Sequence, residues 1–146
     1  MRQSEETFEV NAIKVIPADE FQLPLHAVRQ AAAKGRAIFA LTNIIKHAVI
    51  LQSQAVLLTE DDCRKLAETS LWVYRFALGG QCAIVFGDIS FCNHADTPNA
   101  TVSWTRLTST SAIASLIALT DINANSEIVI TYSDAEEYRR RGIIFC

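Results

Sequence analysis

The segment 93–100, Asn-His-Ala-Asp-Thr-Pro-Asn-Ala, places polar side chains beside a proline that favours a turn. An Asn amide both donates and accepts hydrogen bonds, and a His ring binds ligands through either nitrogen. Downstream, residues 127–132, Glu-Ile-Val-Ile-Thr-Tyr, predict a strand that ends on Tyr132. A phenol at the end of a strand can orient a reacting group or stabilise its charge. Together the two segments predict an active-site turn beside a tyrosine.

Each segment also has a structural interpretation. Asp96, Pro98 and Asn99 suit an ordinary turn in which side chains satisfy the local backbone. Tyr132 could pack at the rim of the core with its hydroxyl in water, as amphipathic aromatic residues often do. Neither interpretation explains why Gly35 and the two segments occur in this order along the chain.

The order of these segments resembles the SET-domain protein-lysine methyltransferases. That family carries an Asn-His-Ser-x-x-Pro-Asn-Ala-like segment, then a strand ending in a catalytic Tyr. Residues 35–40, Gly-Arg-Ala-Ile-Phe-Ala, resemble its opening Gly-x-Gly-Val-Phe-Ala. The resemblance covers roughly Phe8 to Tyr138 and is closest to the compact viral type without flanking zinc-binding domains. It implies a mainly β SET-domain fold with a few short helices, in which the C-terminal segment near Tyr132 threads beside the Asn93 turn as a pseudoknot.

The activity implied by the resemblance is methylation of a lysine side chain in a histone or other protein, with S-adenosylmethionine as cofactor. Tyr132 matches the catalytic tyrosine, with an electrostatic and positioning role. Tyr74 stands where compact viral relatives carry a second tyrosine that lines the lysine channel; its alternative is a core position on an apolar helix. The resemblance implies six cofactor-binding residues: Gly35, Arg36, Ala37, Asn93, His94 and Tyr138. Among them, His94 would act largely through its backbone and Tyr138 would cover the adenine.

Four positions depart from the family pattern. Ala37 replaces the second Gly, Ala95 replaces Ser, Asn125-Ser126 replaces Gly-Glu, and Ser133 replaces the Gly after the catalytic Tyr. If position 37 needs a positive φ, alanine costs about 1 kcal/mol or more there. These departures favour an alternative function, a catalytically inactive SET-like module that binds a peptide in the same groove. Such a module could act as a homodimer.

The cysteines allow a further alternative. Cys92 and His94 are close enough in sequence to suggest a thiol hydrolase, although no orienting Asp or Asn is evident. The cysteines lack any Cys-x-x-Cys or Cys-x-Cys spacing, which disfavours a zinc site and a disulfide framework, and reduced thiols are expected. No metal is expected.

Composition sets wider limits. The 146 residues, half of them apolar, predict a single domain over 1–146 with its core at about 8–138. The net charge of −3 is dispersed, so direct binding to nucleic acid is not expected and a cationic peptide suits the chain better. No signal peptide or membrane span is evident, which predicts a soluble intracellular protein of the cytoplasm or nucleus.

Local patterns predict the elements that hold these residues. A helix is expected over 25–34, ended by Gly35. A second helix is expected to begin after Thr59 and to continue, with one apolar stripe, to Gly79-Gly80. A last helix, with a capping box of Ser133 and Glu136, is expected to end at Gly142. The predicted strands are 8–15, 37–41, 48–51, 55–58, 83–86, 102–107, 112–119 and 127–132.

Overall fold

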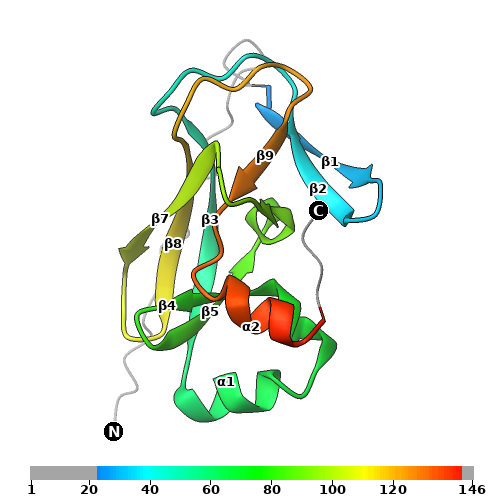
Figure 1. The fold of residues 1–146 in the computed structure, drawn as a ribbon. Coiled ribbons are helices and arrows are strands. Elements are labelled where there is room, and N and C mark those ends of the chain that lie inside the picture. Colours follow the sequence, from blue (N-terminus) through cyan, green and yellow to red (C-terminus); the bar gives the residue numbers. More distant parts are fainter. Residues whose placement is uncertain (1–22, 143–146) are drawn as a thin grey trace, which may run out of the picture.

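Two β-sheets pack against each other in the computed structural model, which describes residues 23–142 (Figure 1). The four-stranded sheet has the order β1 (His26–Ala31), β2 (Gly35–Ala40), β9 (Glu127–Ile130), β6 (Asn93–His94). The five-stranded sheet has the order β4 (Arg75–Leu78), β5 (Gln81–Phe86), β3 (Val49–Leu58), β8 (Ser111–Ala118), β7 (Ala100–Arg106). The mainly β fold class is therefore confirmed.

The core lies between the sheets. Ile38 of β2 and Ile128 of β9 enter it from the smaller sheet, and Leu116 of β8 enters from the larger one; all three are fully buried. Burying one such side chain is worth about 1.5–3 kcal/mol. This shared cluster holds the two sheets in a fixed relation, so residues at the end of the smaller sheet are rigidly placed against the larger one.

β6 and β9 form the one parallel pair among the described strands, with Asn93 opposite Val129 and His94 opposite Ile130. β9 also pairs with β2, so it lies between β2 and β6. Segments more than thirty residues apart in the chain are thereby held side by side, and the Asn93 turn meets the end of β9. This is the pseudoknot arrangement that the resemblance implied.

The predicted helix over 25–34 is wrong. The chain there forms β1, which pairs with β2 through a short turn. Positive φ angles at Ala33 (64°) and Gly35 (77°) reverse the chain, so the glycine serves a hairpin and not the end of a helix. Pairing with β2 outweighs the helix propensity of the alanines because propensity is a weak preference. The expected strand at 8–15 lies outside the described residues.

The second predicted helix begins correctly and ends too late. Thr59 caps α1 (Glu60–Leu66) by accepting a hydrogen bond from the Asp62 N–H. The chain then forms the 3₁₀ helix η2 (Ser70–Tyr74), and β4 and β5 make a hairpin at Gly79-Gly80. The apolar residues beyond α1 were interpreted as one face of a continuing helix. Helical spacing alone does not show that the later ones belong to β4, which pairs with β5.

Two further details differ from expectation. The predicted strands 48–51 and 55–58 are parts of β3, which contains an irregularity between Val49 and Leu51. The capping box before α2 (Ala135–Arg140) does not form, because the N-cap residue is Asp134 and no side chain caps the helix. The other short helix, η3 (Asp88–Phe91), precedes the Asn93 turn. No helix within residues 23–142 is long and apolar enough to cross a membrane.

The expectation of reduced thiols throughout is wrong for one pair. Cys63 of α1 and Cys82 of β5 form a disulfide. α1 packs on β5, which brings the two Cα atoms to 5.7 Å, a spacing that a disulfide spans without backbone movement. Cys92 is a free, buried thiol.

Candidate active site

A cavity of about 630 Å³ lies between the β1–β2 hairpin and the segments that carry η2, η3 and α2. It contains every predicted site residue except Ala37 in its wall: Gly35, Arg36, Tyr74, Asn93, His94, Tyr132 and Tyr138. Ala37 is fully buried in β2 and does not line the cavity. The backbone conformation that favours glycine falls at Ala33 and Gly35, so alanine at position 37 carries no positive-φ strain.

Tyr132 follows β9, and its hydroxyl donates to the carbonyl oxygen of Cys92 at 2.6 Å. Burial raises the pKa of this phenol above its ordinary value, with further contributions from Tyr138 and Cys92. Tyr132 therefore keeps its proton at any physiological pH. Such a group can orient a ligand or stabilise charge, but it cannot serve as a base.

His94 fixes the backbone at Tyr132. Its Nδ1 accepts a hydrogen bond from the Tyr132 N–H at 2.9 Å, and its Nε2 lies 3.0 Å from Asp96 Oδ1. Because Nδ1 accepts, the proton of the neutral ring belongs on Nε2, which donates to Asp96. That hydrogen bond, followed by the charge of Arg139, lowers the pKa of Asp96. The buried His94 side chain thus fixes the backbone just after β9 and ties it to the Asn93 turn. Its sequence context alone did not reveal this role.

Asn93 is held by Glu127, which in turn pairs with Lys34, and both of these residues are outside the expected set. Its Nδ2 donates to Glu127 Oε1 at 2.8 Å, and Glu127 Oε2 lies 3.3 Å from Lys34 Nζ. Lys34 is at the tip of the β1–β2 hairpin and lines the cavity. The sequence analysis did not predict this series of contacts, because it placed Lys34 in a helix and interpreted Glu127 only as the start of a strand.

Asn99 clamps β9 with both ends of its amide. Its Nδ2 donates to the Glu127 carbonyl at 2.8 Å, and its Oδ1 accepts from the Val129 N–H at 2.9 Å. The alternative, structural interpretation of the motif assigned Asn99 to the local turn, whereas its amide bonds a strand about thirty residues away. The Asn-His and Pro-Asn parts of the motif therefore grip the same strand from two positions.

Tyr74 ends η2 at the rim of the cavity. Its hydroxyl accepts a hydrogen bond from Arg36 Nη2 at 3.2 Å, and its ring meets Phe91 edge-on with centroids 6.2 Å apart. The Arg36 guanidinium also lies 4.2 Å above the Phe91 ring, a cation–π distance. Tyr74 is therefore neither a mid-helix residue nor a core residue.

Tyr138 connects α2 to η2. Its hydroxyl donates to the Val73 carbonyl at 3.1 Å, and its ring packs 4.5 Å from that of Trp72. Burial is the main cause that raises the pKa of Tyr138 to about 12. Trp72 is in turn covered by the guanidinium groups of Arg75 and Arg141, at 4.1 and 3.9 Å. This stack holds α2 against the cavity, and its cation–π partners were not anticipated from the sequence.

A second cavity, of about 220 Å³, meets the first at Tyr132. Its outer wall is formed by β4, β7 and residues 130–134, and it includes the apolar side chains Phe76, Val102 and Trp104. The residues common to both cavities are Val73, Tyr74, Ser90, Cys92 and Tyr132. The arrangement suits two ligands that approach one point from different directions.

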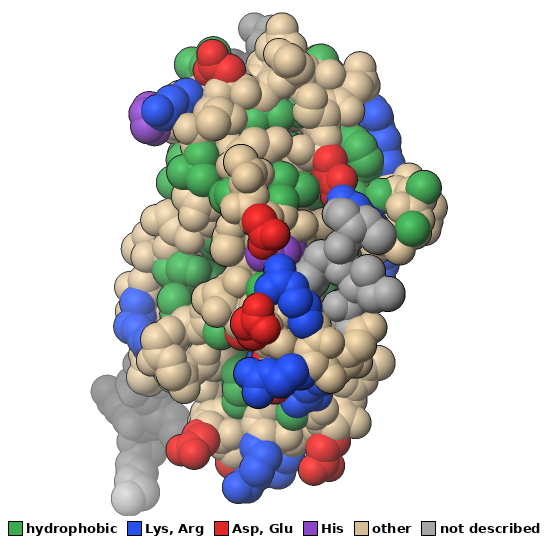
Figure 2. All heavy atoms as spheres, in the orientation of Figure 1, with side chains coloured by type: hydrophobic (Ala, Val, Ile, Leu, Met, Phe, Trp, Pro, Cys, Tyr) green, Lys and Arg blue, Asp and Glu red, His purple; other side chains and the backbone are tan. Residues whose placement is uncertain are grey.

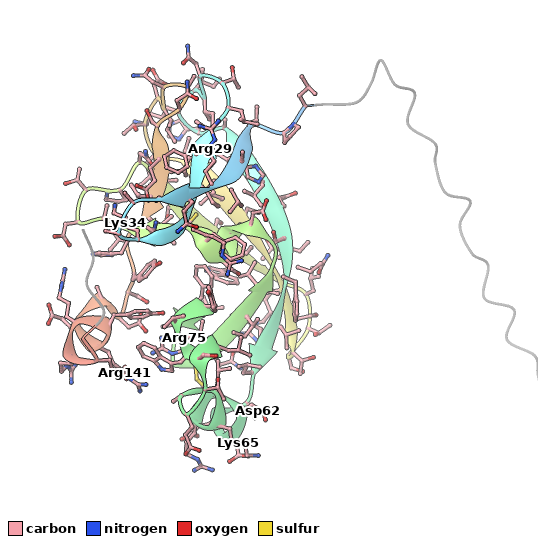
Figure 3. The ribbon with its side chains drawn as sticks, turned by 90° about the vertical axis from the view of Figure 1, so that its right-hand side faces the viewer. Arg29, Lys34, Asp62, Lys65, Arg75 and Arg141 are labelled. Carbon is pink, nitrogen blue, oxygen red and sulfur yellow. A yellow bond between two sulfur atoms is a disulfide. The ribbon has the colours of Figure 1, made fainter. Side chains whose placement is uncertain are left out.

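The surface near α2 carries charges of both signs. Figure 2 shows Lys and Arg interspersed with Asp and Glu over this face, without a continuous basic area. Figure 3 shows Lys34 at the hairpin and Arg75 and Arg141 in the facing part of the molecule. Within residues 23–142 no group of three His, Cys, Asp or Glu side chains could hold a metal ion.

The Cys92–His94 hydrolase finds no support in this geometry. Burial raises the pKa of the Cys92 thiol, which opposes formation of the nucleophilic thiolate. The two ring nitrogens of His94 bond to Tyr132 and Asp96. Neither the thiol nor the imidazole is arranged for covalent catalysis.

Comparison with known proteins defines the family. The SET-domain model matches residues 35–133, and the chain belongs to the SET-domain family of protein-lysine methyltransferases. The fold is similar to a crystal structure of a Plasmodium falciparum protein named as a candidate histone methyltransferase. That similarity has a TM-score of 0.63 at 22% identity, and covers 77% of this chain and 96% of the other. No curated protein matches the chain.

Proposed function

We propose that the chain transfers a methyl group from S-adenosylmethionine to the side-chain amine of a lysine in a protein. The larger cavity would hold the cofactor and the smaller one would admit the lysine. The observation that carries this proposal is the position of Tyr132, whose side chain belongs to the wall of both cavities. Family membership supports the reaction class.

The residues of the larger cavity fit the parts of the cofactor. Its volume, about 630 Å³, is within the usual range for small-molecule sites. Tyr138 contributes to the cavity wall although its ring is buried against Trp72 and Tyr132, and the Asn93 amide can donate and accept. The hairpin residues Gly35 and Arg36 form the facing wall. When bound, S-adenosylmethionine supplies a methyl group that is electrophilic because it is attached to a positively charged sulfur.

Tyr132 and Cys92 would position the reaction. The Tyr132 hydroxyl and the Cys92 carbonyl are bonded to each other at the junction of the cavities, so polar oxygens are already oriented there. Fixed oxygens favour developing positive charge without the cost of reorganisation. Holding an amine and a methyl donor in line is a large entropic contribution to rate. Tyr132 acts in this scheme through its dipole and its position.

The incoming lysine must lose a proton before it reacts, because its free amine has a pKa of about 10.4. Tyr132 cannot take that proton, since burial raises its own pKa and keeps it protonated. The proton must leave through water at the mouth of the smaller cavity. The wall of that cavity combines the apolar side chains of Phe76, Val102 and Trp104 with the ion pair of Arg75 and Asp134.

The departures from the family pattern are accommodated by the fold. Ala95 contributes through its backbone, because its N–H donates to the Ile130 carbonyl and its own carbonyl accepts from Thr131. Asn125 adopts a positive φ of 66°, which asparagine tolerates better than most residues. The departures at Ala95 and Asn125 therefore do not by themselves favour the inactive peptide-binding module.

Isothermal calorimetry with S-adenosylmethionine and its demethylated product tests cofactor binding directly. Ligand at a hundred times its dissociation constant should raise the free energy of unfolding by about 2.7 kcal/mol. Incubation with radiolabelled cofactor and histones or a protein lysate, followed by mass spectrometry of labelled peptides, tests for methyl-lysine. Binding without transfer would favour the inactive module, and no binding at millimolar ligand would refute the proposal.

A further inference from the structure

The five-stranded sheet turns one side toward the core and the other side away from it. Along β3 and β8 successive side chains point to opposite sides, and the buried residues Ala55 and Leu116 mark the core side. In Figure 3, β3 lies at the right-hand margin of the described ribbon, with α2 at the left and α1 below. We call the middle of the side that points away from the core the outer face; its residues are Gln52, Gln54, Val56, Phe86, Ile113 and Ser115.

The outer face joins side chains of three strands into one patch. Gln54 is in register with Phe86 of β5 and with Ile113 of β8, so it lies at the centre. Beside it, the Gln52 amide donates a hydrogen bond to the Ser115 hydroxyl at 2.8 Å. No residue of the outer face lines either cavity, so the patch is separate from the candidate active site.

Two apolar side chains of the outer face are well exposed. Phe86 is 66% exposed and Val56 is 40% exposed. Large apolar side chains that gather on a surface and are rimmed by polar ones mark sites of protein interaction. An aromatic ring such as that of Phe86 contributes strongly there, because it buries a large area. These features define the outer face as an interaction surface.

The outer face is also uncharged. None of its residues is ionisable, although 20% of the residues in the chain are charged. A partner with charged side chains would have to bury them there without a counter-charge, which is unfavourable. A second copy of the same face brings no charge, and its glutamine amides both donate and accept hydrogen bonds. The net charge of −3 disfavours contact between two copies through other surfaces.

We propose that two copies of the chain associate through the outer face, about a two-fold axis that buries the same surface on both. Strands about 4.8 Å apart, with a rise of about 3.3 Å per residue, give β5, β3, β8 and β7 together a face roughly 20 Å across. Such a face is smaller than the roughly 800 Å² that each partner buries in a standard interface. The dimer should therefore be reversible and depend on concentration. It does not depend on the proposed function, because the outer face shares no residue with either cavity.

Sedimentation velocity of the full chain, from about 1 to about 500 μM, tests for this dimer in the affinity range of a small interface. Wild type should change from monomer to dimer over this range. Phe86→Ala should raise the dissociation constant at least about 10-fold, as for an aromatic residue that anchors a contact. Ile45→Ala is the matched control, because Ile45 is 73% exposed in the turn between β2 and β3, and it should leave the dissociation constant unchanged.

A charge swap at Gln54 tests whether the outer face meets itself. Gln54→Glu and Gln54→Lys each place like charges opposite one another in a symmetric dimer, and each should weaken it at least about 10-fold at low salt. An equal mixture of the two variants should form the dimer again. A mixture no better than either variant alone, or a dimer that Phe86→Ala leaves unchanged, would overturn the proposal. A full chain that stays monomeric throughout would also overturn it, and would leave the outer face to residues 1–22 or to another protein.

Discussion

The two walls of the larger cavity are built in different ways. On the pseudoknot side, His94 and Asn99 bond β9 and the Tyr132 backbone at 2.8–2.9 Å, and the Tyr132 hydroxyl is bonded to the Cys92 carbonyl. On the hairpin side, the turn has an alanine with positive φ, and Lys34 is held by an ion pair at 3.3 Å.

This difference separates two tasks. Groups placed at a reacting centre gain from rigid orientation, because reorganisation during the reaction costs free energy. Groups that receive and release a ligand need contacts that exchange readily. The pseudoknot wall is suited to the first task and the hairpin wall to the second. The following predictions test that contrast, beginning with the largest expected effect.

Asn99→Ala should damage the pseudoknot wall most. It leaves the Val129 N–H and the Glu127 carbonyl without their partner, and we expect a loss of roughly 2–4 kcal/mol in the free energy of unfolding. Urea denaturation measures it. Asn43→Ala is the control, because Asn43 bonds a single exposed N–H, that of Ala124. Equal losses in the two variants would show that the pseudoknot is no more constrained than a surface loop.

Alkaline pH should weaken the packing of α2 against η2, beside the pseudoknot wall. Tyr138 has a pKa of about 12 in the folded protein, against about 10 for a free phenol, so the native state holds the proton more tightly. The contribution of the protonated Tyr138 to the free energy of unfolding is complete below pH ~10 and is lost as the pH rises through about 12. The free energy of unfolding should fall by roughly 2–3 kcal/mol over this range. Denaturation midpoints from pH 8 to 12 should fall over that window, and less steeply in Tyr138→Phe. A midpoint that is flat to pH 12 in wild type would contradict the burial of this hydroxyl.

Ala33→Gly should stabilise the hairpin wall. Glycine adopts the φ of 64° found at this position without the steric cost of a Cβ atom. We expect a gain of about 0.5–1 kcal/mol in thermal or urea unfolding, reduced by the greater freedom of glycine in the unfolded chain. Ala32→Gly is the natural control, because position 32 is in the same turn without a positive φ, and it should destabilise. If both substitutions destabilise the protein, the positive φ of Ala33 does not strain the hairpin.

Tyr74→Phe should have the smallest effect on stability. The Arg36–Tyr74 hydrogen bond is exposed, so we expect a loss below about 0.5–1 kcal/mol. The hydroxyl is at the edge of both cavities, and its removal frees space where a methylated amine would turn. Mass spectrometry at matched turnover should then show more di- and trimethyl-lysine. An unchanged product ratio would remove Tyr74 from the lysine channel.

The sequence predicted the pseudoknot wall better than the hairpin wall. The Asn-His and Pro-Asn segments and the strand before Tyr132 were identified because turn residues and β-branched runs are local signals. Their contact across more than thirty residues was inferred from family resemblance and is present in the fold. The bonds by which His94 and Asn99 hold β9 could not be anticipated, because they depend on tertiary pairing.

The hairpin wall was misread because its alanines favour a helix in isolation. Pairing with β2 decides the structure there, and that partner is invisible to local propensity. The error hid Lys34, since a helix would have placed it on an exposed face. The Cys63–Cys82 disulfide was missed for the same reason: the two residues meet only when α1 packs on β5.

The most direct test of the central claim is Tyr132→Phe, measured for cofactor affinity and for methyl incorporation. The hydroxyl is assigned to the point where the cavities meet, so its removal should lower the methylation rate by about 100-fold or more, as for loss of one oriented donor. Affinity for S-adenosylmethionine should stay within about 2-fold, because the proposal assigns the hydroxyl to the transition state and not to cofactor binding. Near wild-type incorporation by the Phe variant would contradict this account.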